Sequence, residues 1–162
     1  MKYIYFTIVS LLNFACHQPA SDTGVLQSRI DTLEKKIATS YKPGLGEIMG
    51  GIQAHHSKLW FAGQNQNWKL ADFEVREIME AVEDIQKFQS ERKERQLVAM
   101  LNPAIDSVND AIRQKSAPLF KSSFILLTNT CNKCHRASNF EFNMVKIPAT
   151  SPFSNQEFSV SQ

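Results

Sequence analysis

Apolar residues recur every three or four positions along most of the chain, which is the spacing of one face of an α-helix. The pattern predicts helices over residues 45–63, 68–88 and 97–115, and a last helix that begins at Pro118 and runs to about residue 137. No alternation with a period of two, typical of a strand, competes with it. Amphipathic helices joined by short turns bury their apolar faces best side by side, so we expect an all-α fold, an antiparallel four-helix bundle.

The apolar stripes indicate which side chains should face the core. In the first two of these helices the stripes comprise Leu45, Ile48, Met49, Ile52, His56, Leu59 and Trp60, then Leu70, Phe73, Ile78, Met79, Val82 and Ile85. In the last helix the stripe comprises Leu119, Phe120, Phe124, Leu127 and Cys131. Pro103 should kink the third helix or start its main part, because proline lacks the backbone N–H of a helix interior. The charged stretch 90–95 is expected to be a solvated connection.

Outside the bundle, residues 43–137, we expect three further segments. Residues 16–42 would hold a polar linker, 21–24, and a short helix in which Leu26, Ile30, Leu33 and Ile37 follow steps of four and three. Such a coiled-coil-like stripe either pairs with a second copy, giving a homo-dimer, or lies against the bundle as a spacer. Residues 138–162 should form an irregular tail, whose Phe140, Phe142, Phe153 and Phe158 either cover the site or belong to a loose end.

The N-terminus has the regions of a secretory signal over residues 1–15. Lys2 precedes an apolar run, residues 3–14, which is too short to span a bilayer. The sequence Ala15-Cys16 at its end resembles a bacterial lipoprotein signal, in which the cysteine carries the lipid. We therefore expect an exported protein, lipid-anchored through Cys16 on the periplasmic side of a bacterial membrane.

Cys131, Cys134 and His135 form CNKCH, the C-x-x-C-H pattern to which haem c is attached covalently. Two thiols on one helical turn can each add to a haem vinyl group, and the adjacent imidazole then lies beneath the iron as its proximal ligand. The alternatives are half of a zinc site, which would need further ligands, and a thiol redox pair, which is usual beside a strand-helix unit.

Cysteine number and charge narrow the function further. The chain has three cysteines, so a lipid on Cys16 and one haem on the other two account for all of them without a disulfide. The formal net charge is +2 including Lys2, and no basic run suits nucleic acid. No second metal cluster or nucleophile-base arrangement is evident, so we expect no enzyme.

The arrangement resembles the class II c-type cytochromes, the cytochrome c′ group, which carry C-x-x-C-H late in the last helix of a four-helix bundle. The segments IQAHHSKLWFAG, NWKLADFE, CNKCHRASNFEFN and PFSNQEF also resemble a sparsely characterised subgroup of bacterial haem-binding proteins related to that class. The resemblance implies one covalent haem and a sixth iron position supplied by the first bundle helix.

Met49 is the first candidate for that sixth position. It falls at the ligating methionine when the helix is laid on the family pattern, and an antiparallel helix rising about 1.5 Å per residue reaches the level of His135 near Met49. The competitor is His56, about 10 Å further along the same face. Trp60 and Phe124 should be haem wall or bundle core, and these two roles are not separable in the sequence.

The sequence therefore predicts a monohaem c-type cytochrome that carries single electrons between redox partner proteins. A gas-binding or gas-sensing haem protein, with an open or displaceable sixth position for NO or CO, is the alternative. The identity of the sixth ligand separates the two functions, because a strong sixth ligand favours electron transfer.

Overall fold

The computed structural model describes residues 21–160 of the 162-residue chain. The predicted leader, residues 1–15, and the predicted lipidation site Cys16 lie outside the described residues. Within residues 21–160 the fold is all-α and contains no strand, as the periodicity predicts. The chain divides into two compact units between Tyr41 and Lys42.

The first unit contains helix α2, Ser21–Ala38. The expectation of a polar linker over residues 21–24 is wrong, because these residues form the first turn of this helix. Asp22 in the first turn and Lys35 and Lys36 in the last turn interact favourably with the helix dipole. A polar first turn can therefore be helical here.

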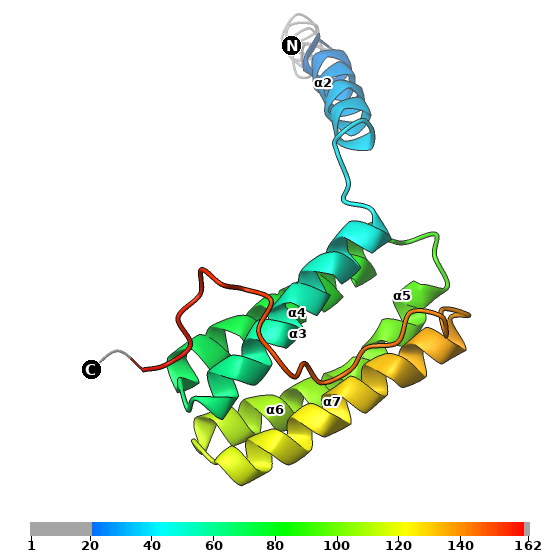
Figure 1. The fold of residues 1–162 in the computed structure, drawn as a ribbon. Helices are drawn as coiled ribbons and strands as arrows, with labels where there is room; N and C mark the ends of the chain where they lie inside the picture. Colours follow the sequence, from blue (N-terminus) through cyan, green and yellow to red (C-terminus); the bar gives the residue numbers. More distant parts are fainter. Residues whose placement is uncertain (1–20, 161–162) are drawn as a thin grey trace, which may run out of the picture. The chain divides into compact units, whose positions relative to one another are not determined.

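The second unit contains the remaining helices (Figure 1): α3, Leu45–Gln64; α4, Trp68–Phe88; α5, Glu94–Leu97; η1, a 3₁₀ turn, Val98–Leu101; α6, Asn102–Arg113; and α7, Ala117–Ala137. Helix α3 packs against α4, α6 packs against α7, and contacts between α4 and α6 and between α3 and α7 join the two pairs. The predicted bounds of α3 and α4 are confirmed to within one residue. In the described residues, no helix is long and apolar enough to cross a bilayer.

Helices α3, α6 and α7 end in the same way, with a non-glycine residue in the left-handed region. Gln66, Lys115 and Asn139 have φ values of 55°, 50° and 62°. After each of them the next N–H donates to a carbonyl five residues back, in the pairs Asn67–Ala62, Ser116–Ala111 and Phe140–His135 at 2.9, 3.1 and 2.8 Å. This Schellman arrangement satisfies the last helix carbonyls and turns the chain sharply.

The segment expected as one helix over residues 97–115 is broken into α5, η1 and α6. Pro103 lies in the first turn of α6, where its missing N–H needs no partner, so of the two expected roles it starts the main part of the helix. The expected solvated connection ends early, because α5 begins at Glu94 and this side chain is buried.

The core follows the predicted stripes with two exceptions. Phe73 is 52% exposed and Leu119 is 47% exposed, although both were expected inside. Helix α4 buries Ile78, Val82 and Ile85 as predicted, and it also buries Ala71, Glu74 and Val75. Phe73 lies off this face, so its size does not bring it into the core.

The tail, residues 138–160, contains no helix or strand, as predicted, but parts of it are packed. Phe158 is buried, with its ring 5.5 Å from that of Phe61 on α3. Phe153 lies beneath the Lys58 ammonium at 5.0 Å. Phe142, by contrast, is largely exposed. The tail is therefore an ordered covering of the helices near Phe61 and Lys58.

Candidate functional site

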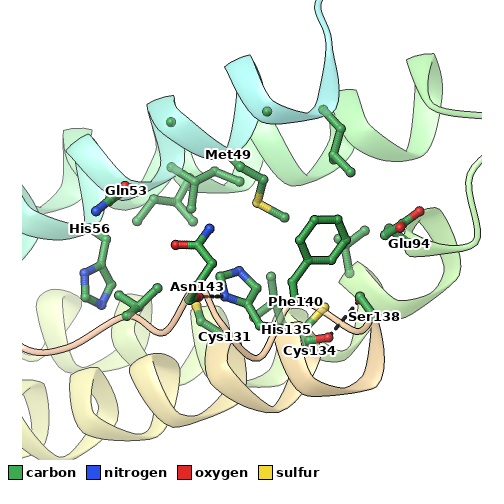
Figure 2. Close-up of a pocket in the computed structure, with 18 of the residues that line it drawn as sticks. Met49, Gln53, His56, Glu94, Cys131, Cys134, His135, Ser138, Phe140 and Asn143 are labelled. Atoms are coloured by element: carbon green, nitrogen blue, oxygen red, sulfur yellow. Dashed lines mark hydrogen bonds between the residues drawn. The ribbon is translucent and has the colours of Figure 1, made fainter.

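A cavity of about 440 Å³ lies in the second unit, and its walls are mostly apolar. Figure 2 shows its two principal walls: Met49 and Gln53 project from α3, while Cys131, Cys134 and His135 project from α7 on the other side. Phe140 and Asn143 reach the same space from the tail. The cavity therefore brings together the predicted haem-attachment motif and both candidates for the sixth iron ligand, since His56 also lines it.

The motif residues occupy the last turns of α7. Cys131 and Cys134 are three residues apart and lie on the same side of the helix, while His135 is on the adjoining position. Both cysteines are free thiols. The structure thus presents two sulfur atoms and one imidazole to one wall of the cavity.

Both thiols stay protonated at neutral pH. Burial, reinforced by the neighbouring Cys134, raises the pKa of Cys131 to about 12. Burial also raises the pKa of Cys134, against the lowering effect of a hydrogen bond with Ser138 and with a smaller contribution from Glu94. Catalytic dithiols require the opposite shift, because the thiolate is the nucleophile. The thiol redox pair considered from the sequence is therefore disfavoured.

His135 is oriented by the tail. Its Nδ1 lies 2.5 Å from the backbone carbonyl oxygen of Asn143. A carbonyl can only accept a hydrogen bond, so Nδ1 carries the proton and donates it. In the neutral imidazole this leaves the lone pair on Nε2. Metal-binding histidines commonly have this arrangement, in which the second nitrogen donates to a carbonyl and fixes the ring.

The carbonyl of Asn143 is held in place by Asn132, the second residue of the motif. The Asn132 side chain donates from Nδ2 to the Val145 carbonyl and accepts from the Val145 N–H, both at 2.8 Å. Together with the turn at Asn139, this pair of hydrogen bonds returns the tail along the end of α7. We call residues 140–145 the strap, since they run past the motif and place Phe140 and Asn143 at the cavity.

The opposite wall, on α3, includes two glycines. Gly46 and Gly50 line the cavity on either side of Met49, and a Cβ atom added at either glycine would meet no heavy atom within 4 Å. Met49 is half-buried and packs against the edge of the core. Its thioether sulfur is a soft, weak donor with three rotatable bonds behind it. This wall therefore offers one sulfur donor between two positions without side chains.

His56 is engaged with the core rather than free. Its Nε2 lies 2.9 Å from Thr128 Oγ1, and that hydroxyl is also 2.9 Å from the Phe124 carbonyl, to which it must donate. Thr128 Oγ1 therefore accepts from His56 Nε2–H. Burial lowers the pKa of His56 to about 4, so the ring is neutral at physiological pH. Only Nδ1 of this ring keeps its lone pair.

Trp60 and Phe124 are not among the residues that line the cavity. They lie just beyond His56 in an aromatic cluster in which the Trp60 and Phe124 rings are 4.9 Å apart and the Phe124 and His56 rings are 4.5 Å apart. Phe120 continues the cluster, 5.8 Å from Phe124. The cluster fixes the position of His56 and closes this end of the site.

Sequence reasoning missed several residues at the cavity. Asn132, Asn143, Arg92 and Glu94 all belong to it or hold its wall. Asn132 carries a detectable signal, because it is an amide side chain within the motif. Asn143 carries none, because it acts through a backbone carbonyl that every residue has.

The site has no ready-made metal cage: in residues 21–160 no group of three or more His, Cys, Asp or Glu side chains is arranged to hold a metal ion. His55, beside His56, is occupied elsewhere, with Nδ1 2.6 Å from the buried carboxylate of Glu74.

No protein-family model, curated protein or solved structure matches this chain.

Proposed function

We propose that the chain is a monohaem c-type cytochrome that carries single electrons, with α3, α4, α6 and α7 as an antiparallel four-helix bundle around one covalent haem. Thioether bonds from Cys131 and Cys134 would attach the haem, and His135 would be its proximal ligand. The observation that carries the proposal is that the CNKCH residues line one cavity and that, in the same place, His135 Nδ1 donates a hydrogen bond to the Asn143 carbonyl. That hydrogen bond leaves the lone pair of Nε2 free to bind the iron.

The residues present suit a haem. The cavity volume of about 440 Å³ lies in the range usual for small-molecule sites. Gly46 and Gly50 leave open space where side chains would otherwise fill it. A porphyrin brings four nitrogen donors of its own, so the iron needs only one or two ligands from the chain, and a cage of three or more protein ligands is not required. Half of a zinc site, by contrast, would lack ligands here.

When bound, the haem would supply a one-electron couple, and the chain would set its environment. His135 would hold the iron from α7, and the strap would keep its ring in one orientation. Met49 is the sixth ligand we favour, because it is half-buried on the wall opposite His135. His56 is held in the core by Thr128 and the Phe124 ring, and only its Nδ1 keeps a lone pair. The apolar walls would exclude water, which is one of the ways a protein tunes a haem.

We also propose where the protein is located and what its partners are. Export through residues 1–15 and a lipid on Cys16 would place the haem domain on the periplasmic side of a bacterial membrane, where redox proteins would be its partners. The export signal and CNKCH support each other, because haem c is attached on that side.

The test is to express the chain in a host that attaches haem c and to measure its intact mass and its alkaline pyridine spectrum. We expect the mass to rise by one haem and the spectrum to be that of a haem with both vinyl groups saturated. The pair Cys131→Ala and Cys134→Ala should abolish covalent attachment, whereas Asn129→Ala, on an exposed position of the same helix, should not. A chain that folds in this host with no haem attached would overturn the proposal.

Carbon monoxide then separates the carrier from the alternative function. A six-coordinate haem that cycles reversibly between oxidation states and does not bind the gas supports electron transfer. A five-coordinate haem that binds the gas at once would replace it with the gas-binding function.

A further inference from the structure

Helix α2 leaves an apolar stripe on its own surface. Leu26, Ile30, Leu33 and Ile37 are 54%, 46%, 57% and 66% exposed on this helix. They follow one another at steps of four, three and four residues, which places them along one narrow line of the helix. Large apolar side chains gathered on one face of a short helix need a partner, because an isolated helix of this length is marginal in water.

The residue types along the stripe select the partner. In heptad notation Ile30 and Ile37 occupy a positions, while Leu26 and Leu33 occupy d positions. β-Branched residues at a positions with leucine at d positions favour a parallel pair of helices over higher oligomers. We propose that α2 is a dimerisation helix, which forms a parallel two-stranded coiled coil with α2 of a second copy of this chain.

Charge complementarity supports the same partner and fixes its direction. Arg29 occupies a g position and Glu34 the following e position, so they lie on opposite edges of the stripe. In a parallel pair, g of one helix lies beside the following e of the other, which brings Arg29 next to Glu34 of the second copy, twice by symmetry.

An antiparallel pair would lack this match. There the g positions of the two helices face each other, and they include Arg29 and Lys36. Like charges so placed repel, so the edge residues select against this orientation. This pairing does not depend on the haem, because it involves residues 21–38 alone.

The test measures the mass of the full-length holoprotein over a range of concentrations by sedimentation equilibrium. We expect a reversible monomer–dimer equilibrium that shifts toward monomer in high salt. Ile30→Lys should give a monomer, while Ser28→Lys, an equal change away from the stripe, should leave the dimer intact. Since every variant keeps residues 1–20, any association caused by them is common to all samples.

Charge reversal tests orientation and remains informative if Ile30→Lys unfolds α2. Arg29→Glu should weaken the dimer roughly tenfold, because two attractive pairs become repulsive, and adding Glu34→Arg should restore it. A wild-type protein that stays monomeric, a dimer unaffected by Ile30→Lys, or a dimer strengthened by Arg29→Glu would each overturn the proposal; the last result would indicate antiparallel helices.

Discussion

The Nδ1 atom of His135 donates a hydrogen bond to the backbone carbonyl of Asn143, eight residues later in the chain. The bond joins the last helix to the strap and places the imidazole proton on Nδ1, which leaves the lone pair of the neutral ring on Nε2. Because Asn132 holds the strap through Val145, the orientation of His135 depends on the Asn132 side chain as well as on the Asn143 carbonyl.

This dependence predicts the effect of Asn132→Ala. Loss of both hydrogen bonds to Val145 should free the strap and weaken the bond to His135, so the imidazole would become a poorer donor to the iron of the proposed haem. The oxidised iron gains most from a basic ligand, so the reduction potential should rise, by about 59 mV for each tenfold difference in the relative stability of the two states. Redox titration of the holoprotein measures the shift.

Asn129→Ala is the matched control for this prediction, since Asn129 is an exposed asparagine on the same helix. Its potential should equal that of the wild type. An equal potential for Asn132→Ala and the wild type would show that the strap has no influence on the iron.

Met49→Ala should change the coordination of the proposed haem. Removal of the thioether takes away the sixth ligand, so the low-spin spectrum should become high-spin and carbon monoxide should bind. His56→Ala should leave the spin state unchanged, since its ring is held in the core by Thr128 and Phe124 and is not the proposed ligand. Optical and resonance Raman spectra of the two holoproteins decide between Met49 and His56; the opposite pattern would make His56 the ligand.

Much of the fold follows from the sequence because helical periodicity is a local property. The bounds of α3 and α4, the proline at the start of α6 and the placement of CNKCH late in α7 were all predicted correctly. Burial at the edge of a stripe was less predictable: Phe73 was expected in the core and is exposed, whereas Val75, two residues later, is fully buried. Which of two adjacent faces is buried depends on contacts that the local pattern does not contain.

The site was predictable where it depends on side-chain identity and unpredictable where it depends on the backbone. Cys131, Cys134, His135, Met49 and His56 were named from the sequence, and all of them line one cavity. The strap was not foreseen, because its contact with His135 is a main-chain carbonyl. Its sharp return depends on Asn139 in the left-handed region, a conformation that asparagine tolerates better than most residues but does not dictate.

His56 predicts a specific dependence of stability on pH. Burial lowers its pKa in the folded protein to about 4, whereas a histidine in the unfolded chain has a pKa of about 6.5. Between these values the unfolded state binds more protons, so this residue's contribution is complete above pH 6.5 and is lost as the pH falls toward 4. At about 1.36 kcal/mol per pKa unit, the difference between the two pKa values changes the free energy of unfolding by about 3 kcal/mol.

Urea unfolding of the wild type and of His56→Gln at pH 7 and pH 5 measures this contribution. Glutamine can still donate to Thr128 but does not titrate, so the variant should lose less stability between the two pH values, by roughly 2 kcal/mol. Parallel losses in the two proteins would show that His56 does not titrate in this window.

Gly63→Ala should destabilise the protein through the contact between the end of α3 and the start of α7. A Cβ atom at Gly63 would lie 2.1 Å from Cε1 of Phe120, whose ring is fully buried and cannot move aside without displacing Trp60 and Phe124. Overpacking of this kind costs about 1–3 kcal/mol. Gly51→Ala on the same helix is the matched control, because its added methyl group meets nothing within 4 Å. Since alanine is the better helix former, this change should stabilise by up to about 1 kcal/mol. Urea unfolding followed by circular dichroism should therefore give a midpoint below that of the wild type for Gly63→Ala and above it for Gly51→Ala. A Gly63→Ala midpoint at or above that of the wild type would contradict the close packing of Phe120 on α3.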